Sequence, residues 1–592
     1  MADEPLDASP STPSAAAAAD GVSSSSAAAP APALRPRREA FEHGLLPIPK
    51  LVFPEGTLTQ TLAQLKEKLA SGGARVGATA LAEALQIPAE QAALALGTLA
   101  AVLPAEDPAL GEDGAGEADL RDVLLFLYIQ SYKRLVPRGH SPAVADVWPS
   151  TSAFDGCLSA LSPIQFIRCN SRRFMPSQAD EEAHQLSYLQ KHIANILTLL
   201  ADSVDGEGDD SMVLTMETFE HLGFLFQLSE GIPLSQAASF FANSDPDMPA
   251  APVPATLVHD WILQHIASTL ELMAEKSSTK ENSQLSASDP DVTMSDAVTN
   301  TRIYSSSPTG TSAPNNAGYY RNTTFVEGLS KTSVLKQTSD MKGHSIKVLN
   351  CHDSVIYILA PLKYATVYGC SDTTIVLGAI GKVVKVEHCE RVQIIAASRR
   401  ICIANCRECT FYLGVNHQPL IIGDNHKLQV APFNTYYPQL GEHLTQVGVD
   451  PNVNKWDQPF VLGVVDPHDS LSHPAGVSDV QAESATCLDT DLFTNFLIPS
   501  WFEPQGPTKY NPFTLPEVYW ASQRKKHASL EDIQKNIREL EIDDNRKKEL
   551  ACALHAQFKD WLYGELIMFR CNYDDRLLFA FFYLSVVDQF VA

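Results

Sequence analysis

Four cysteines recur at nearly equal intervals in the middle of this 592-residue chain, and they restrict its fold more than any other feature. They are Cys351, Cys370, Cys389 and Cys406, at spacings of 19, 19 and 17 residues. Apolar residues recur five and three positions before each cysteine, and five and seven positions after it. The four columns are Ile346, Ala365, Val384, Ile401; Val348, Val367, Val386, Ile403; Ile356, Ile375, Ile394, Phe411; and Ile358, Leu377, Ala396, Leu413. This alternation is typical of short β-strands whose equivalent residues lie above one another.

Such a repeat predicts a β-solenoid. One unit cannot bury its apolar side alone, whereas stacked units share a continuous core. A parallel β-helix is the favoured form, with the cysteines buried inside it as small apolar residues. An antiparallel meander with coincidental spacing is the alternative, and four aligned columns over four units argue against it.

Composition divides the remainder of the chain into further segments. The first residues are mostly Ala, Ser and Pro, which cannot supply a core. Leucines at helical spacing follow, as in Leu58, Leu62, Leu65 and Leu69. The predicted segments are a disordered tail over 1–45, an α-helical domain over 46–275, a flexible linker over 276–315, the solenoid domain over 316–465, a loop-rich linker over 466–515 and an α-helical region over 516–592.

Charge argues against a nucleic-acid binder. The chain carries a formal net charge of −26, and no basic face is evident that would offset it. Residues Ala80–Leu96 have a helix-turn-helix rhythm with Pro88 opening the second helix, but that helix carries Glu90 and no Lys or Arg. A packed helical hairpin is therefore the prediction for this stretch.

The chain start lacks the pattern of a secretory signal, and the longest apolar run, Leu577–Val587, is too short to cross a bilayer. We therefore expect no transmembrane segment, reduced thiols and a cytoplasmic protein.

Motifs that carry known chemistry are missing from the sequence. It has no Gly-rich nucleotide loop, no nucleophile elbow and no zinc helix. Cys402, Cys406 and Cys409 resemble a metal signature, but strand alternation turns Cys402 outward and Cys406 inward, so they do not converge on one ion. We expect neither a metal site nor a cofactor.

The last repeats and the segment after them resemble a known family. The stretch HCERVQIIAASRRICIANCRECTFYLGVNHQP is followed by TYYPQL and Trp456. Cysteine-headed units, a Gln418-Pro419 turn, Tyr436-Tyr437-Pro438 and Trp456, in this order, are similar to the tubulin-folding cofactor C domain. The resemblance covers roughly residues 316–460 and implies a right-handed parallel β-helix. The family has three branches: cofactor C itself, the X-linked retinitis pigmentosa protein two, and a third. The flanking helical regions and the IPSWFEP segment of this chain resemble the third branch.

Active members of the family accelerate GTP hydrolysis by tubulin or Arf-like GTPases through the arginine of a Gln-x-Arg motif. Such an arginine finger neutralises charge that develops on the transferred phosphoryl group. The two motif positions fall on Arg400 and Cys402 in this chain. A thiol carries no fixed positive charge, so the resemblance predicts that the finger is lost.

The repeat aligns Cys402 with Lys347, Thr366 and Lys385, and we expect this row to face solvent. Lys347, Lys385, Arg399 and Arg400 are therefore candidate partner-binding residues. Arg400 or Arg399 could act as a substitute finger; alternatively, both belong to a solvated rim or bind an acidic partner such as a tubulin tail. An arginine in place of Cys402 should then be tolerated, whereas an aspartate in place of Cys389 should break the solenoid.

The leading functional hypothesis follows from the third branch. It is a non-enzymatic cytoskeletal protein of microtubule-organising centres, centrosomes and spindle poles, which influences the position of the centrosome, basal body and Golgi and the shape of the cell. Its expected partners are cytoskeletal or centrosomal proteins, with tubulin or an Arf-like GTPase as candidates. The alternatives are a GTPase-activating protein that uses Arg400 or Arg399, and a tubulin-folding cofactor.

Overall fold

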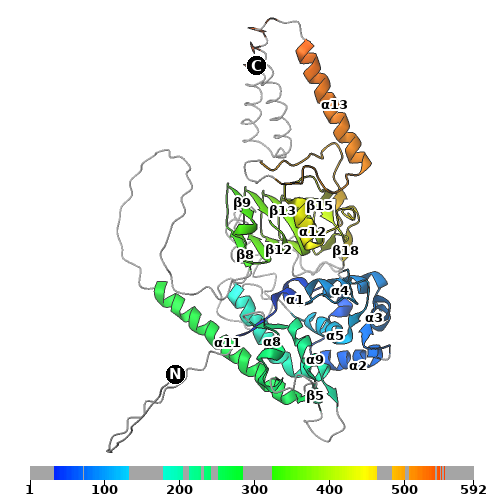
Figure 1. Ribbon diagram of the computed structural model, residues 1–592, viewed down its shortest axis with the longest axis vertical. Coiled ribbons are helices and arrows are strands. Elements are labelled where there is room, and N and C mark those ends of the chain that lie inside the picture. Colours follow the sequence, from blue (N-terminus) through cyan, green and yellow to red (C-terminus); the bar gives the residue numbers. More distant parts are fainter. Residues whose placement is uncertain are drawn as a thin grey trace, which may run out of the picture.

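The computed structural model of the chain shows two ordered regions, an N-terminal helical region and a β-solenoid, which contact each other along one face (Figure 1). The described residues are 33–70, 72–111, 113–132, 178–203, 212–228, 232–241, 251–284, 323–462, 483–499, 506–539, 543, 545–546, 548–549 and 552–553. Much of the predicted linkers and of the C-terminal helical region, and the apolar run Leu577–Val587, lie outside these residues. Within the described part of the chain, no helix is long and apolar enough to cross a membrane.

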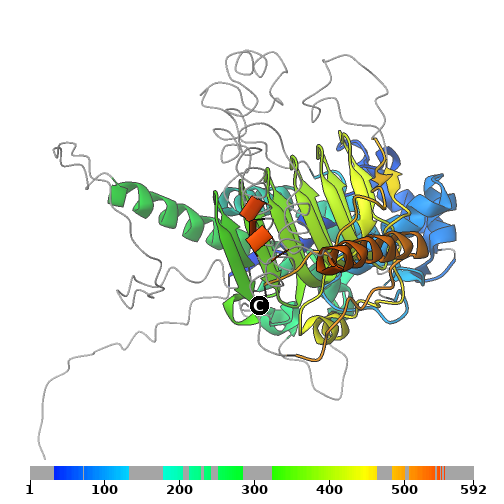
Figure 2. The same cartoon turned by 90° about the horizontal axis from the view of Figure 1, so that it is seen from above.

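The predicted solenoid is confirmed as a stack of parallel strands. Its strands are β8 (Thr323–Glu327), β9 (Ser333–Gln337), β10 (Ser345–Leu349), β11 (Val355–Leu359), β12 (Leu362–Tyr368), β13 (Thr374–Glu387), β14 (Gln393–Ala404), β15 (Thr410–Val415), β16 (Leu420–Ile422), β17 (Gln429–Pro432), β18 (Phe460–Leu462) and β19 (Thr486–Cys487). All pairings between them are parallel. Figure 2 shows successive strands of the stack side by side, from green to yellow.

The long strands β13 and β14 bend and contribute to two sheets. One sheet runs through β8, β10, β12, the later halves of β13 and β14, then β16 and β18. The other runs through β9, β11, the first halves of β13 and β14, then β15, β17 and β19. The apolar columns of the repeat fill the space between the two sheets.

The cysteine-headed turns explain the periodicity of the sequence. The residue before each cysteine has a positive φ. The φ is 52° at Asn350, 65° at Gly369, 53° at His388 and 52° at Asn405. Asn and Gly tolerate this left-handed conformation best. All four cysteines are buried, as expected. Their thiols donate to carbonyls of the turn, as Cys406 Sγ does to the Ala404 carbonyl at 3.2 Å.

The N-terminal region is mainly helical and has its own core. Its elements are β1 (Leu34–Pro36), α1 (Arg38–His43), η1 (Pro49–Leu51), α2 (Leu58–Ala70), β2 (Arg75–Val76), α3 (Ala78–Leu85), α4 (Ala89–Val102), β3 (Ala118–Asp119), α5 (Leu120–Ile129), α8 (Gln178–Leu200), β4 (Asp202–Ser203), β5 (Met212–Leu214), α9 (Met216–Glu220), η3 (His221–Phe224), β6 (Phe226–Leu228), α10 (Leu234–Ala237), η4 (Ser239–Phe241), β7 (Val253–Pro254) and α11 (Ala255–Gln284). The predicted hairpin is α3 and α4. Leu58, Leu62, Leu65 and Leu69 form the buried face of α2, as predicted.

One boundary of the helical domain is earlier than the sequence interpretation placed it. Residues 34–43 were assigned to the disordered tail, but they form β1 and α1. Leu34, Ala40 and Phe41 are buried in the core, and β1 pairs with β6. These apolar side chains give α1 a fixed place, because their burial offsets the entropy lost on ordering the segment.

The segment after β17 packs on the side of the stack rather than over its end. Tyr437 is buried beside β13, and α12 (Leu440–Val447) packs on the same strand. The stack is instead extended by β18 beside β16 and β19 beside β17. Phe493, Phe496 and Phe513 then pack into the solenoid core, and α13 (Glu517–Glu539) follows them.

Candidate functional site

The row of residues that contains Cys402 is aligned as the repeat predicted. Lys347 is in register with Thr366, Thr366 with Lys385, and Lys385 with Cys402. The expectation that this row faces solvent is wrong. Lys347 and Thr366 are only 6% and 7% exposed, and Cys402 is half-buried. The row points out of the solenoid, but the N-terminal helical region lies against it (Figure 1); we call this surface the covered face.

Helix α1 supplies the first contact with the covered face. The Glu42 carboxylate lies 2.7 Å from Lys347 Nζ, and Lys385 Nζ donates to the Glu42 carbonyl at 3.1 Å. Burial by itself would raise the pKa of Glu42, but the charge and hydrogen bond of Lys347, together with His43 and Arg38, outweigh it, and the pKa falls to about 2. Lys385 also pairs with Glu387 of its own strand, at 2.9 Å. Glu42 is therefore an ionised, buried partner of the solenoid.

A small apolar contact lies beside this pair. The His43 ring stacks on the Tyr364 ring, with centroids 4.7 Å apart. Tyr364 also donates its hydroxyl proton to the Ala101 carbonyl of α4, at 2.7 Å, and forms a cluster with Ala101 and Val383. Burial lowers the pKa of His43 to about 3, so this imidazole is neutral near pH 7.

Arg400 contacts the N-terminal region at the other side of the row. Its Nη2 donates to the Asp113 carbonyl at 3.0 Å, and the guanidinium lies over Gly97 of α4. A Cβ on Gly97 would come within 2.5 Å of that nitrogen. Burial lowers the pKa of Arg400 to about 10, so it stays charged near pH 7. The Asp113 carboxylate contacts His417 Nε2 at 2.8 Å.

Arg399 does not lie on the covered face. Its side chain is buried, and its Nε donates to the Gly448 carbonyl at the end of α12, at 2.9 Å. Adjacent residues of a strand point to opposite sides, so Arg399 and Arg400 cannot serve the same surface. The prediction that treated the two arginines together is therefore corrected: Arg399 attaches α12 to β14.

Cys402 occupies the second position of the family motif. Burial raises the pKa of its thiol to about 12, so the group is neutral near pH 7. A neutral thiol can neither pair with a phosphate nor attack an electrophile well. The position lies beside Lys385, which is its register partner on β13.

The other motif residues have structural surroundings. Tyr437 bonds to His443 Nδ1 at 2.9 Å, and Trp456 packs edge-on to Tyr519. The Pro419 carbonyl accepts from Phe460 N as β18 begins, while Gln418 and Tyr436 are exposed and Pro438 is half-buried.

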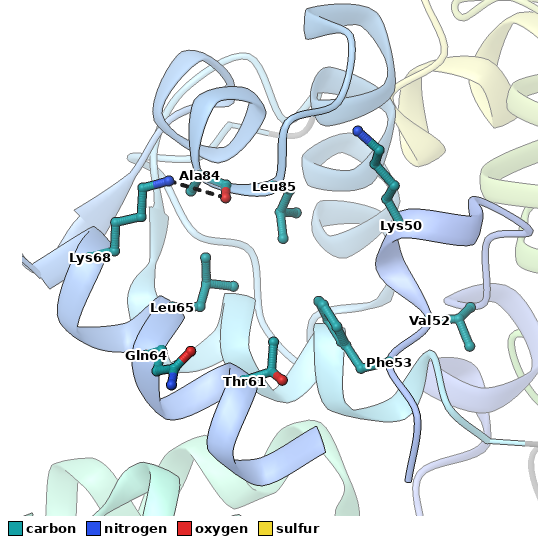
Figure 3. A pocket seen from close by; sticks show the side chains of 9 residues that line it. All are labelled: Lys50, Val52, Phe53, Thr61, Gln64, Leu65, Lys68, Ala84 and Leu85. Carbon is teal, nitrogen blue, oxygen red and sulfur yellow. Dashed lines mark hydrogen bonds between the residues drawn. The ribbon is translucent and has the colours of Figure 1, made fainter. Parts of the chain in front are cut away.

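Among the described residues, no group of three or more His, Cys, Asp or Glu is arranged to hold a metal ion. A cavity of about 420 Å³ lies between α2, α3 and the segment around Phe53 (Figure 3). Its lining residues are Lys50, Val52, Phe53, Thr61, Gln64, Leu65, Lys68, Ala84 and Leu85, and they include no carboxylate, imidazole or thiol. Both lysines donate to carbonyls at the end of α3, Lys50 to Gln86 and Lys68 to Ala84.

Several residues of the covered interface were missed in the sequence. Glu42 and His43 fell in a segment assigned to the tail on composition, and Tyr364, Ala101 and Asp113 carry no motif. The one available signal was the apolar run that begins at Phe41, since Leu45, Leu46 and Ile48 continue it. That run indicates a domain boundary nearer the N-terminus.

Comparison with known proteins places the solenoid in a family. A family model described as tubulin binding cofactor C matches residues 343–460. TBCC domain-containing protein 1 of Mus musculus is 28% identical over 232 residues, which are 39% of this chain and 39% of the mouse protein. The Homo sapiens protein of that name has the same identity and the same coverage. The Danio rerio protein is 23% identical over 457 residues, 75% of this chain and 73% of its own length.

The matched part thus spans about two fifths of the mouse and human proteins. Residues 343–460, which the family model matches, contain most of the parallel solenoid, the cysteine-headed turns and the motif positions at Arg400 and Cys402. Residues 343–460 therefore match the tubulin binding cofactor C family, in a chain that is similar to TBCC domain-containing protein 1.

Proposed function

We propose that this chain is a non-enzymatic interaction protein of the microtubule cytoskeleton. The tubulin binding cofactor C domain supports a role related to tubulin cofactors. The finer proposal is that the chain acts at microtubule-organising centres and spindle poles and influences the position of the centrosome or basal body and of the Golgi.

One observation carries the non-enzymatic part of the proposal. The motif positions are occupied by Arg400, which contacts the N-terminal helical region, and by Cys402, which is half-buried. A finger must carry a positive charge into the nucleotide site of a partner. The Cys402 thiol is neutral, and the Arg400 guanidinium is held by the Asp113 carbonyl. We therefore expect docking without acceleration of GTP hydrolysis.

Single-turnover GTP hydrolysis tests this expectation. Tubulin and a panel of Arf-like GTPases would be assayed with and without the full chain. We expect the hydrolysis rate constants to be unchanged. An acceleration of the size that an arginine finger supplies, about 10³-fold or more, would overturn the proposal. Arg400 would then be the first residue to mutate, with Arg399 as the matched control on the opposite side of the strand.

Imaging tests the place of action. The full chain, fluorescently tagged, should concentrate at a marker of microtubule-organising centres, and its depletion should displace the centrosome and scatter the Golgi. Cys389→Asp, which should disrupt the solenoid, is the negative control, and its tagged form should be diffuse. Uniform distribution of the wild-type chain would count against this proposal.

A further inference from the structure

We propose that the N-terminal helical region is a built-in ligand of the covered face, and that an acidic polypeptide segment competes with it for the cations there. This inference concerns regulation of the surface used in the proposed function, and it rests on that function only for the identity of the surface. The cations are Lys347, Lys382, Lys385 and Arg400, and we call them the cationic row.

Charge complementarity is the first argument. Every member of the cationic row is contacted by an acidic residue of the N-terminal region. Lys347 pairs with the Glu42 carboxylate at 2.7 Å, and Lys382 lies 3.6 Å from the Glu106 carboxylate. Lys385 and Arg400 are held by the backbone carbonyls of Glu42 and Asp113. The helical region therefore already occupies the row as an acidic polypeptide would.

The acceptors that the N-terminal region offers to these cations also favour competition. Two of the four cations receive from the N-terminal region a neutral carbonyl rather than a carboxylate, although Lys385 has Glu387 on its own strand. A carboxylate acceptor adds an ion-pair attraction to a hydrogen bond from an ammonium or guanidinium, which a neutral carbonyl does not supply. A flexible segment rich in Glu or Asp could thus replace the two carbonyl contacts with stronger ones.

The hydrophobic cores of the helical region and the solenoid are largely separate. The helical region and the solenoid each bury a core of their own, and the cluster of Ala101, Tyr364 and Val383 between them belongs to neither. Leu420, Ile422 and Phe460, on β16 and β18, pack against the helical core at the far end of the same sheet. The contacts on β10, β12 and β13 can therefore open while β16 and β18 stay in contact, without unfolding of either core. Strand β14, which carries Arg400 and Cys402, lies between these two parts of the sheet.

Substitutions in α4 give a matched test in the full-length chain. Ala101→Glu places a carboxylate against Tyr364 and Val383 and should open the contacts on β10, β12 and β13. Ala93→Glu adds the same charge on the exposed side of the same helix and should not. Neither variant adds a cation that could itself bind an acidic probe.

Two readouts follow opening and binding. Alkylation of Cys402 by N-ethylmaleimide, followed by peptide mass spectrometry, reports exposure of the covered face. Fluorescence anisotropy of a labelled poly-glutamate peptide at low salt reports binding to the row. We expect Ala101→Glu to raise both the alkylation rate and the affinity at least tenfold, with Ala93→Glu at the wild-type level. Adding Lys385→Gln and Arg400→Gln to Ala101→Glu should abolish the gain in affinity.

Three results would overturn the inference. One is faster alkylation of Ala101→Glu without a gain in affinity; another is wild-type affinity equal to that of Ala101→Glu; the third is alkylation as slow as in the wild type. If Ala101→Glu does not melt cooperatively, Glu42→Gln takes its place, because it removes only the charge facing Lys347. These assays contain neither a GTPase nor a cell, so their failure is distinguishable from failure of the proposed function.

Discussion

Single buried groups determine how the solenoid and its covered face respond to substitution. Cys389 and Cys402 both belong to the repeat, but Cys389 is buried in the solenoid core, whereas Cys402 points out of the solenoid and is half-buried. A new charge would therefore disrupt the solenoid core at Cys389 and its outer face at Cys402.

Cys389→Asp should destabilise the solenoid by more than about 3 kcal/mol, because a carboxylate would be buried there without a partner. Cys389 is 2% exposed, and its thiol donates to the Glu387 carbonyl. Urea unfolding followed by circular dichroism would measure the change. Cys389→Ala, which leaves only a small cavity, should cost about 1 kcal/mol. Equal midpoints for the two variants would contradict the prediction.

Cys402→Arg should leave the solenoid stable but weaken its contact with the helical region. The sequence interpretation expected this change to be tolerated because the position was taken to face water. Here the new guanidinium would be buried beside Lys385 and cost about 1–3 kcal/mol. Scanning calorimetry should show an unchanged solenoid transition and an earlier helical one. Cys402→Ser is the control, and a lowered solenoid transition in Cys402→Arg would argue against this assignment.

At the scale of elements, a glycine in β13 allows the segment after β17 to pack closely against the side of the stack. A Cβ on Gly378 of β13 would lie 2.6 Å from the Tyr437 hydroxyl oxygen and 3.1 Å from the Ile358 carbonyl oxygen. Tyr437 is therefore held against a strand in the middle of the solenoid. Arg399 holds the end of α12 to β14 in the same region.

Gly378→Ala should therefore destabilise the solenoid by about 1–3 kcal/mol through overpacking. The Tyr437→Phe change removes the hydroxyl that the new methyl group would meet, so the double variant should recover part of the loss. A double-mutant cycle in urea measures the coupling. Additive effects of the two changes would show that the hydroxyl is not what restricts this position.

For the whole molecule, acid should loosen the contact between the two regions. His43 has a pKa of about 3 in the closed arrangement against its ordinary 6.5, chiefly through burial; Glu42 and Glu387 favour its protonation, and Lys385 and Lys347 oppose it. Below pH 6.5 the open form therefore binds a proton that the closed form does not. The closed form should lose stability by about 1.4 kcal/mol per pH unit as pH falls from 6.5 toward 3.

Glu42 acts in a lower window. Its pKa is depressed to about 2 from 4.5, so its contribution is complete above pH 4.5 and is lost as pH falls toward 2. Between pH 6.5 and 4.5 the slope therefore reports His43 rather than Glu42. Calorimetry in that range should show the helical transition moving down with pH. His43→Gln should reduce the slope, and the remainder should come from His417, whose pKa is lowered to about 4, chiefly by burial. An unchanged slope in His43→Gln would exclude His43 as a source.

The repeat by itself determined the solenoid, because its periods come from strand alternation and from left-handed turns that Asn and Gly favour locally. It also aligned Lys347, Thr366, Lys385 and Cys402 in one row. Which way that row faces in the folded chain was decided only by tertiary structure. Side-chain alternation separates the inside of a solenoid from its outside, but whether the outside meets water depends on Glu42, Tyr364 and Ala101, which are distant in sequence and share no period.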